Sequence, residues 1–267
     1  MLIVGEKINT SRKAVKEAVT AKDEAFIRRL ARRQHEAGAH YIDVNCGTFV
    51  HNEPELLSWL VQVVQDELGG LPLCIDSPNP AAVEAALKVH QGTAMLNSIT
   101  GEKERYDALE PLVVKYGCKI VVLTMDDESG IPPDAATRFE IAARLIESLA
   151  AKGVSYDDIY VDPLIQPISV DSKNGLSAAE TIRLVRERFP GVHFICGLSN
   201  ISFGLPERKL LNQAYMVVCT TYGLDAVILD PEDKRMMALV YATEALLNRD
   251  PYCANYLKAY RKGILKE

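Results

Sequence analysis

The sequence predicts a (β/α)8 TIM barrel in the α/β class, and three observations favour this fold. Eight short apolar segments alternate along the chain with longer amphipathic segments. The chain has 267 residues, close to the usual size of such a barrel. No Gly-x-Gly-x-x-Gly turn follows the first apolar segment, although the rival fold, an open doubly wound sheet, usually carries one. Because crossover helices keep consecutive strands parallel, we expect one closed barrel, a single domain covering residues 1–267.

The chain is expected to begin with a strand at residues 2–8, a short apolar run. The polar residues 9–11 that follow are suited to cap the next element. A helix is expected at residues 23–36, where apolar residues such as Leu30 recur at helical spacing between charged neighbours. Gly38 then ends this helix, because glycine readily adopts the conformation that closes a helix.

The same alternation continues to the carboxyl end. The remaining strands are expected at residues 41–47, 73–76, 94–98, 119–125, 159–164, 193–198 and 225–229. The remaining helices are expected at residues 54–67, 80–90, 102–116, 135–152, 177–189, 208–222 and 232–248. Pro80 suits a first helical turn, and Gly117, Gly153, Gly191 and Gly223 lie just after helix ends.

Two connections are longer than the others, at residues 126–134 and 165–176. Both follow strands, so in a barrel they lie on the face where ligands bind. We expect them to serve as lids or docking loops.

Composition excludes several classes of protein. The net charge of −6 provides no broad basic field for nucleic acid, and the arginines between residues 28 and 33 fit the solvated face of a helix. No apolar run is long enough to cross a bilayer, and no basic leader precedes an apolar stretch. We therefore expect a cytoplasmic protein with neither a nucleic-acid nor a membrane partner.

The six cysteines contain no Cys-x-x-Cys pair and lie mostly in apolar segments, as reduced core residues do. His193 and Cys196 are the nearest candidates for metal ligands. Strand alternation points these two side chains to opposite faces, so we expect no metal site.

A change of character occurs within residues 193–204. The segment begins as an apolar strand and then switches to Gly197, Ser199 and Asn200 at the expected carboxyl end. Ligands bind at that position in parallel α/β folds, although glycine and serine also form ordinary turns. Both interpretations remain open for this segment alone.

Polar residues recur at the carboxyl ends of the other expected strands. They are Asp43, Asn45, Asp76, Ser77, Asn97, Ser98, Thr124, Asp162 and Asp230. The sequence shows no nucleophile elbow, no phosphate loop and no Ser-His-Asp order with a usable histidine. These strand ends therefore indicate a site that holds a ligand rather than one built around a protein nucleophile.

The types of donor and acceptor indicate the ligand. A carboxylate only accepts hydrogen bonds, whereas a primary amide both donates and accepts. Asp76, Asn97 and Asp162 together suit a flat heterocycle with adjacent N–H donors, such as a 2-amino-4-oxo pyrimidine edge. An aspartate at a strand end is also a common helix N-cap, and Asp76 is the residue most open to that alternative.

A family resemblance rests on an ordered set of motifs: Ile8-Asn9, Asp43-Val44-Asn45, residues 73–77 (Leu-Cys-Ile-Asp-Ser), Leu96-Asn97-Ser98, residues 161–164 (Val-Asp-Pro-Leu) and residues 197–200 (Gly-Leu-Ser-Asn). Together they resemble the pterin-binding methyltransferases that move a methyl group between tetrahydrofolate and a corrinoid protein. The resemblance covers essentially the whole chain and includes the Asn-Arg-Asp-Pro-Tyr-Cys sequence near its end. It implies a pterin-binding barrel with tetrahydrofolate or 5-methyltetrahydrofolate as substrate.

The resemblance also implies roles for individual residues. Asp76, Asn97 and Asp162 anchor the pterin ring, and Asn200 approaches its N5 atom. Gly197 and Ser199 belong to the same ligand-binding segment, and Arg208 meets the distal part of the folate. Catalysis is thus expected from Asn200 and Asp162, with the corrinoid (cobalamin) carried by a separate protein.

The sequence departs from the family pattern at Phe203, where some acetogenic relatives carry an amide. The dihydropteroate synthases share the barrel, but their Ser-Arg-Lys after the seventh strand is replaced here by Ser199-Asn200-Ile201. A dihydropteroate-synthase-like enzyme is therefore the alternative enzyme, and a non-catalytic folate-binding or docking module is the alternative outside enzymes.

The sequence is compatible with methyl transfer in either direction. The resemblance implies a homodimer, and an aromatic cluster near the carboxyl end fits either a helix packed on the barrel or a subunit interface. That cluster consists of Tyr252, Tyr256, Leu257 and Tyr260.

Overall fold

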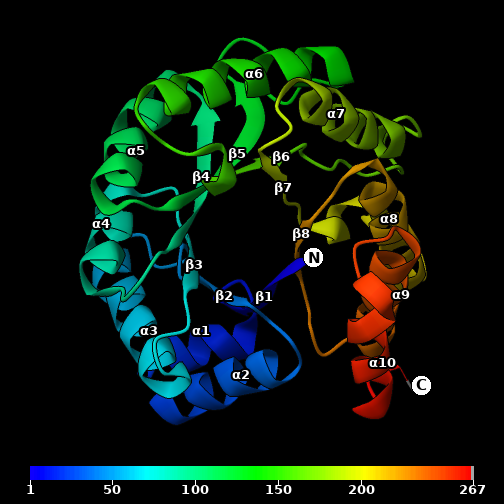
Figure 1. The fold of residues 1–267 in the computed structure, drawn as a ribbon. Helices are drawn as coiled ribbons and strands as arrows, with labels where there is room; N and C mark the ends of the chain where they lie inside the picture. Colours follow the sequence, from blue (N-terminus) through cyan, green and yellow to red (C-terminus); the bar gives the residue numbers. More distant parts are fainter. Residues whose placement is uncertain (266–267) are drawn as a thin grey trace.

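A computed structural model of the chain describes residues 1–265. Eight parallel strands lie at the centre and helices surround them (Figure 1). The strands are β1 (Leu2–Asn9), β2 (Tyr41–Asn45), β3 (Leu73–Asp76), β4 (Met95–Gly101), β5 (Lys119–Asp126), β6 (Ile159–Asp162), β7 (His193–Phe194) and β8 (Ala226–Leu229).

The strands are hydrogen-bonded in the order β7-β6-β5-β4-β3-β2-β1-β8. The two ends of this row meet at a parallel bridge between Gly197 and Ile228. Beside it, the Ile228 amide donates to the Cys196 carbonyl at 3.0 Å. The sheet therefore closes on itself, so the predicted barrel is confirmed and an open sheet is excluded.

The α-helices of the described chain are α1 (Lys13–Thr20), α2 (Glu24–Glu36), α3 (Glu53–Leu68), α4 (Pro80–Val89), α5 (Lys103–Tyr116), α6 (Ala135–Ala151), α7 (Asn174–Arg188), α8 (Arg208–Tyr222), α9 (Lys234–Leu246) and α10 (Ala254–Arg261). Short 3-10 turns are η1 (Tyr156–Asp158), η2 (Leu198–Ser202) and η3 (Pro251–Cys253). Most helix bounds lie within a few residues of those expected.

Two elements differ from the sequence-based expectation. Helix α1 was not expected, because two turns are too short to be stable alone; it forms by burying Val15, Ala18 and Val19 against its neighbours. Strand β7 is shorter than expected, since the chain enters η2 at Leu198. The predicted end of the seventh strand, Leu198, is therefore wrong, because β7 ends at Phe194.

The core has two parts because each strand has two faces. Outward-facing residues such as Ile42 and Leu73 pack under the surrounding helices. The inner part takes Ile195, directly after β7, and one residue from each of the other seven strands: Val4, Tyr41, Cys74, Met95, Val121, Tyr160 and Ala226. Side chains thus fill the lower interior of the barrel, and a ligand can enter only above this layer.

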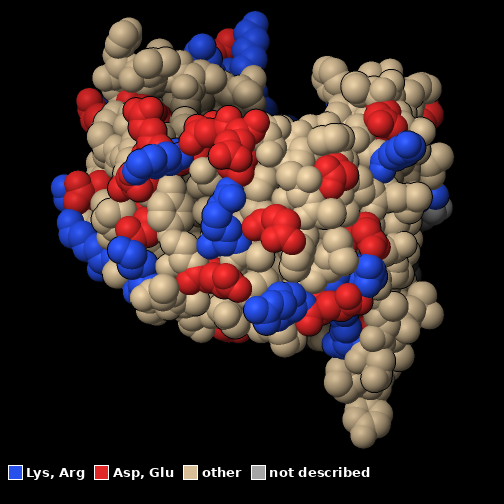
Figure 2. Space-filling view, turned by 90° about the horizontal axis from the view of Figure 1, so that it is seen from above, with Lys and Arg blue, Asp and Glu red and all other residues tan. Residues whose placement is uncertain are grey.

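The surface carries mixed charge. On the face seen in Figure 2, Lys and Arg lie interspersed with Asp and Glu. The arginines of α2 are largely paired, for example Arg28 with Glu24 at 3.0 Å. None of the helices within residues 1–265 combines the length and apolar character required to cross a membrane.

Candidate functional site

A polar layer lies directly above the apolar interior of the barrel. Two residues further along each strand, side chains face the same way as the inner core residues. This step gives Glu6, Asp43, Asp76, Asn97, Leu123, Asp162, Gly197 and Ile228. Since parallel strands end at the same rim, the strand ends together form a polar floor at the carboxyl-terminal mouth.

Strand pairing brings three predicted ligand-binding residues to this floor. Asp76 of β3 is paired in register with Asn97 of β4. Asp162 of β6 is paired with Leu123 of β5, the strand beyond β4. With neighbouring strands about 4.8 Å apart, Asn97 and Asp162 lie on strands roughly 10 Å apart, which leaves room for a flat ring between them.

Asp76 is held in place by an amide. Asn45 Nδ2 donates to Asp76 Oδ2 at 2.8 Å, while Asn45 Oδ1 accepts from the Gly47 amide at 3.1 Å. Burial raises the pKa of Asp76, and the hydrogen bond from Asn45 partly opposes this effect. A sequence alternative for Asp76 was helix capping, but Asn79 caps α4 instead, accepting from the Ala81 amide.

A second carboxyl lies close to Asp76. Asp43 is buried, and its Oδ1 has no hydrogen-bond partner within the described chain. Burial and the neighbouring Asp76 carboxylate raise the pKa of Asp43 well above its ordinary value. A protonated Asp43 lets this part of the floor carry one negative charge rather than two.

The surroundings of Asp162 shift the pKa of its carboxyl group. Its Oδ1 accepts a hydrogen bond from the Leu164 amide at 2.8 Å. Burial raises the pKa of Asp162 to about 7, while the Leu164 amide and the positive charge of Arg138 oppose that rise. A carboxyl that titrates near neutrality is a common feature of binding and catalytic sites.

Turn η2 lies above the floor between β7 and β8. Gly197, which precedes it, occupies an inward-facing position, and a side chain there would meet no heavy atom within 4 Å of its Cβ. Ser199 and Asn200 lie exposed on the turn. The structure thus puts Asn200 on the rim, and no hydrogen bond within residues 1–265 joins it to Asp76, Asn97 or Asp162.

Arg208, expected to meet the distal part of folate, is anchored to the same turn. Its Nη2 donates to the Ser199 carbonyl at 2.6 Å, and its Nε donates to Ser202 Oγ at 3.1 Å. Its guanidinium also lies over the Phe203 ring, 5.9 Å from the centroid. The residue is exposed, so its predicted folate contact stays a prediction.

The long connections after β5 and β6 are linked to η2. The Ile168 amide donates to the Ile201 carbonyl at 3.1 Å, and Ser169 Oγ donates to the Phe203 carbonyl at 2.6 Å. Ser177 Oγ donates to the Pro133 carbonyl at 2.7 Å. These segments form one connected wall on one side of the mouth.

Sequence reasoning missed Glu6 as a lining residue. Glu6 lies with Ser199 and Ile228 in a cavity of about 190 Å³ beside η2. Burial raises the pKa of Glu6, and nearby Arg12, whose Nη2 donates to Glu6 Oε1 at 3.0 Å, opposes the rise. Alternation from Leu2 through Val4 was the signal that predicts its inward position.

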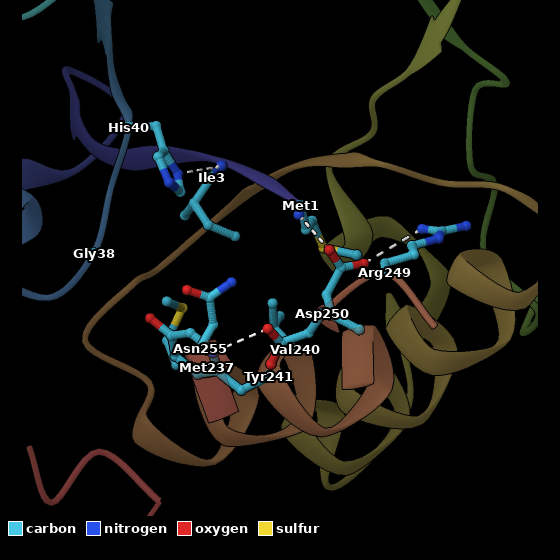
Figure 3. A pocket seen from close by; sticks show the side chains of 11 residues that line it. Met1, Ile3, Gly38, His40, Met237, Val240, Tyr241, Arg249, Asp250 and Asn255 are labelled. Carbon is cyan, nitrogen blue, oxygen red and sulfur yellow. Dashed lines mark hydrogen bonds and ion pairs between the residues drawn. The ribbon is translucent and has the colours of Figure 1, made fainter. Parts of the chain in front are cut away.

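A larger cavity, of about 250 Å³, lies at the opposite end of the barrel, beside the start of β1 (Figure 3). Its charged groups already pair with one another, since Glu244 accepts from the Met1 amine at 2.5 Å and from Arg249 at 3.4 Å. Its histidine, His40, accepts from the Ile3 amide at 3.0 Å. These contacts tie β1 to α9 and indicate a structural role.

Comparison with known proteins assigns the chain to a family. The family model described as "Pterin binding enzyme" matches residues 5–230. The chain belongs to this pterin-binding family.

Two curated relatives are similar in sequence. A methylcorrinoid:tetrahydrofolate methyltransferase of Eubacterium limosum is 39% identical over 265 residues, covering 98% of this chain and 97% of that protein. Methionine synthase of Mycobacterium tuberculosis is 30% identical over 262 residues, covering 90% of this chain but 22% of that longer protein.

Solved pterin-binding structures share the fold. Dihydropteroate synthase from Thermus thermophilus, in complex with 6HMPPP, superposes with a TM-score of 0.67 at 21% identity, covering 92% of this chain and 94% of that one. The enzyme from Xanthomonas albilineans, in complex with 7,8-dihydropteroate, gives a TM-score of 0.69 at 18% identity, covering 92% and 93%. At such identities the likeness extends to the fold alone.

Proposed function

We propose that this protein transfers a methyl group between N5 of tetrahydrofolate and the cobalt of a corrinoid protein. The observation that carries the proposal is the polar floor, in which Asp76, Asn97 and Asp162 lie at one rim above an apolar interior. Membership of the pterin-binding family and the similarity to a methylcorrinoid:tetrahydrofolate methyltransferase support it.

The floor suits the polar edge of a pterin. Asp76 and Asp162, when ionised, accept from the ring N–H groups, and the Asn97 amide matches a position that both donates and accepts. Asn45 keeps the Asp76 carboxylate oriented before the ligand arrives, which reduces the ordering needed on binding. The absence of a side chain at Gly197 leaves space above the floor for the ring.

The transfer needs no protein nucleophile. The reduced cobalt of the corrinoid substrate supplies the electron pair of the new bond to the methyl carbon; as the bond to N5 breaks, N5 keeps its electron pair and carries a proton taken from solvent. Asn200, exposed on η2, donates to N5 or orients a water there, stabilising the charge that changes at that atom. Asp162 and Asp76 position the ring for this displacement. The same arrangement serves the reverse transfer.

The mouth also offers a surface for the corrinoid protein. Large apolar side chains lie exposed on the connections and helix starts that follow β2, β5, β6 and β7: Val50, Ile131, Val170, Leu176, Phe203 and Leu210. Exposed apolar groups gathered around a site are typical of protein–protein contact. We infer that the corrinoid protein docks here, which brings its cobalt over the floor.

Introducing negative charge into this apolar surface separates docking from chemistry. In Phe203→Glu combined with Val170→Glu, we expect transfer to a corrinoid protein to fall about tenfold or more, while transfer to free cobalamin persists. Val114→Glu is the matched control, because Val114 is exposed on α5 at the side of the barrel. Equal losses with both acceptors would argue against docking at the mouth.

The central test is spectroscopic. Purified protein mixed with 5-methyltetrahydrofolate and reduced cobalamin is expected to convert the visible spectrum to that of methylcobalamin, faster than the reaction without protein. Pterin binding without acceleration would identify a non-catalytic folate-binding module. Condensation of a pterin diphosphate with p-aminobenzoate would identify the dihydropteroate-synthase-like alternative.

We also propose a cytoplasmic homodimer. A reducing compartment suits a reduced corrinoid and agrees with the free thiols of Cys46, Cys74, Cys118, Cys196 and Cys219, all buried. The C-terminal helix α10 buries Ala259 but leaves Leu257 and Tyr260 exposed. A second copy of the chain is the proposed cover of this aromatic surface.

A further inference from the structure

Arg138 of α6 is an unusual residue in this barrel, because it is a fully buried cation. Its Nε donates to the Pro132 carbonyl at 2.7 Å, and its Nη1 donates to the Pro163 carbonyl at 2.9 Å. Its Nη2 is buried without a hydrogen-bond partner, and no carboxylate within residues 1–265 forms an ion pair with it. Burying a charge in this way is costly, so its retention calls for a gain elsewhere.

One carbonyl belongs to the long connection after β5, and the other to the first residue after β6. Pro132 lies in the connection after β5, and Pro163 immediately follows Asp162 at the end of β6. Because the guanidinium is planar and rigid, it fixes both segments at a set separation. The Arg138 side chain, which lies outside the barrel wall, thereby holds the position of the chain as it continues from β6.

The segment held by Arg138 is strained. Leu164 has a φ of +56°, in the left-handed region that costs a residue other than glycine about 1 kcal/mol or more. Its amide is the group that donates to Asp162 Oδ1. The hydrogen bond to the Pro163 carbonyl thus stabilises the turn that orients the Asp162 carboxylate.

We propose that Arg138 is a positioning residue for Asp162: it clamps the turn after β6 so that the carboxylate faces the pterin, and its charge favours the ionised, hydrogen-bond-accepting form. Arg138 touches neither substrate in this scheme and acts only through Asp162. The inference rests on the proposed function, since it presumes that Asp162 binds the pterin.

The electrostatic surroundings of Asp162 leave Arg138 as the decisive charge. The titratable neighbours are Cys196 after β7 and Cys219 on α8, with Tyr215 of α8 and Asp134 beside Arg138 itself. Burial raises the pKa values of Cys196, Cys219 and Tyr215, so these groups are uncharged near neutrality. Hydrogen bonds from Thr137 lower the pKa of Asp134, which is therefore ionised, but this carboxylate is exposed to solvent and screened. Removing the Arg138 charge is therefore expected to raise the pKa of Asp162 above neutrality.

The test is a titration of 5-methyltetrahydrofolate binding over roughly pH 5 to 9 for the wild type, Arg138→Gln and Arg138→Lys. In Arg138→Gln we expect the binding midpoint to rise by about one pH unit from the wild-type value near 7, so that affinity falls about fivefold at pH 7 and about tenfold well below the wild-type midpoint. In Arg138→Lys the charge remains but one carbonyl contact is lost, so the midpoint stays near the wild-type value while affinity falls.

Arg183→Gln on α7 is the matched control, because Arg183 is a surface arginine paired with Glu180 and Glu187. A purely structural role for Arg138 predicts a lower melting temperature with an unchanged pH midpoint, and that result would overturn the inference. A wild-type protein that fails to bind at any pH would instead overturn the proposed function.

A second pair of variants guards against loss of folding. Leu164→Gly removes the cost of the positive φ while keeping the backbone amide that Asp162 accepts from. In this background Arg138→Gln is expected to fold and still to shift the pH midpoint upward, because the charge effect remains. If Leu164→Gly and the Leu164→Gly, Arg138→Gln double variant share one midpoint, the electrostatic part of the inference is wrong.

Discussion

Among single residues, the proposed roles in recognition and in chemistry fall at two different positions of the site. Asp162 lies on the floor, held by a backbone amide, with burial bringing its pKa to about 7. Asn200 lies exposed on the turn η2, and within residues 1–265 it forms no hydrogen bond with the floor residues. Under the proposed function, Asp162 on the floor holds the edge of the pterin ring and Asn200 on the rim meets N5.

This separation predicts different kinetic effects for the two residues. We expect Asn200→Ala to lower the single-turnover rate about 10²-fold with little change in folate affinity, by analogy with loss of one preorganised donor. We expect Asp162→Asn to weaken binding by roughly 1.5–3 kcal/mol, because a charged hydrogen-bond acceptor is lost. Binding titrations with single-turnover kinetics distinguish the two, and wild-type values for both variants would contradict the assigned roles.

A third residue-scale prediction concerns Gly197. Its φ of −84° is open to any residue, and no heavy atom lies within 4 Å of a Cβ at this position. Gly197→Val is therefore expected to leave the melting temperature nearly unchanged while filling the space above the floor and weakening pterin binding about tenfold or more. Gly197→Ala should give a smaller loss. A valine variant that binds normally would show that the ring lies elsewhere.

At the scale of elements, a histidine cluster ties the lower ends of three strands together. His193 of β7 bonds through Nδ1 to Asp225 Oδ2 at 3.0 Å and through Nε2 to Asp157 Oδ1 at 3.1 Å. Its ring also stacks on Tyr160 of β6, with centroids 4.8 Å apart. The cluster lies at the start of the strands, far along them from the polar floor, so it serves stability.

The cluster predicts a pH dependence of stability. The hydrogen bond to Asp225 and that to Asp157 raise the pKa of His193 above its ordinary value despite partial burial. Stabilisation from the charged ring is therefore complete below the unfolded-state pKa of about 6.5 and is lost as the pH rises through the raised folded-state pKa.

Urea unfolding of the wild type and His193→Gln across this range provides the measurement. The difference in free energy of unfolding should be larger near pH 6 than at alkaline pH, where the neutral ring keeps its stacking on Tyr160 and one N–H donor but loses its charge. A difference that does not change with pH would show that the ring stays neutral in the folded protein.

At the scale of the whole molecule, the closed barrel leaves two exposed apolar regions with different proposed partners. One surrounds the mouth and includes Val170 and Phe203, and the other includes Leu257 and Tyr260 on the C-terminal helix α10. The region at the mouth must remain accessible, because a corrinoid protein is proposed to dock there. The region on α10 is proposed to be covered by a second subunit.

The proposed homodimer is tested by sedimentation. We expect a mass twice the 29.5 kDa of the chain, and we expect Tyr260→Glu to shift the distribution toward the monomer while 5-methyltetrahydrofolate binding persists. Lys258→Glu, which changes charge on the same helix without removing an apolar group, is the control. A monomeric wild type at all concentrations would refute the homodimer, whereas a dimeric Tyr260→Glu would place the interface elsewhere.

The barrel itself was predictable from local pattern. Alternation of apolar strands with amphipathic helices located all eight strands, and helix ends marked by Pro80 or Gly117 fell where expected. The short helix α1 and the early end of β7 were not predictable, because both depend on packing against neighbouring elements and not on the periodicity of the sequence. Glu6 was predictable as an inward-facing residue from alternation with Leu2 and Val4, but only the folded chain places it with Ser199 in one cavity.

Polar side chains at the strand ends could be recognised from the amino-acid sequence. Because strand residues alternate between two faces and crossover helices keep the strands parallel, the sequence also predicted that Asp76, Asn97 and Asp162 share one rim. The pKa values and hydrogen-bond partners of these residues become apparent only in the folded chain. The burial that brings the pKa of Asp162 to about 7, the neighbour that raises the pKa of Asp43, and the clamp of Arg138 on the turn after β6 all depend on contacts between distant segments. Electrostatics and hydrogen bonding act through distances in space, and spacing along a chain does not specify them.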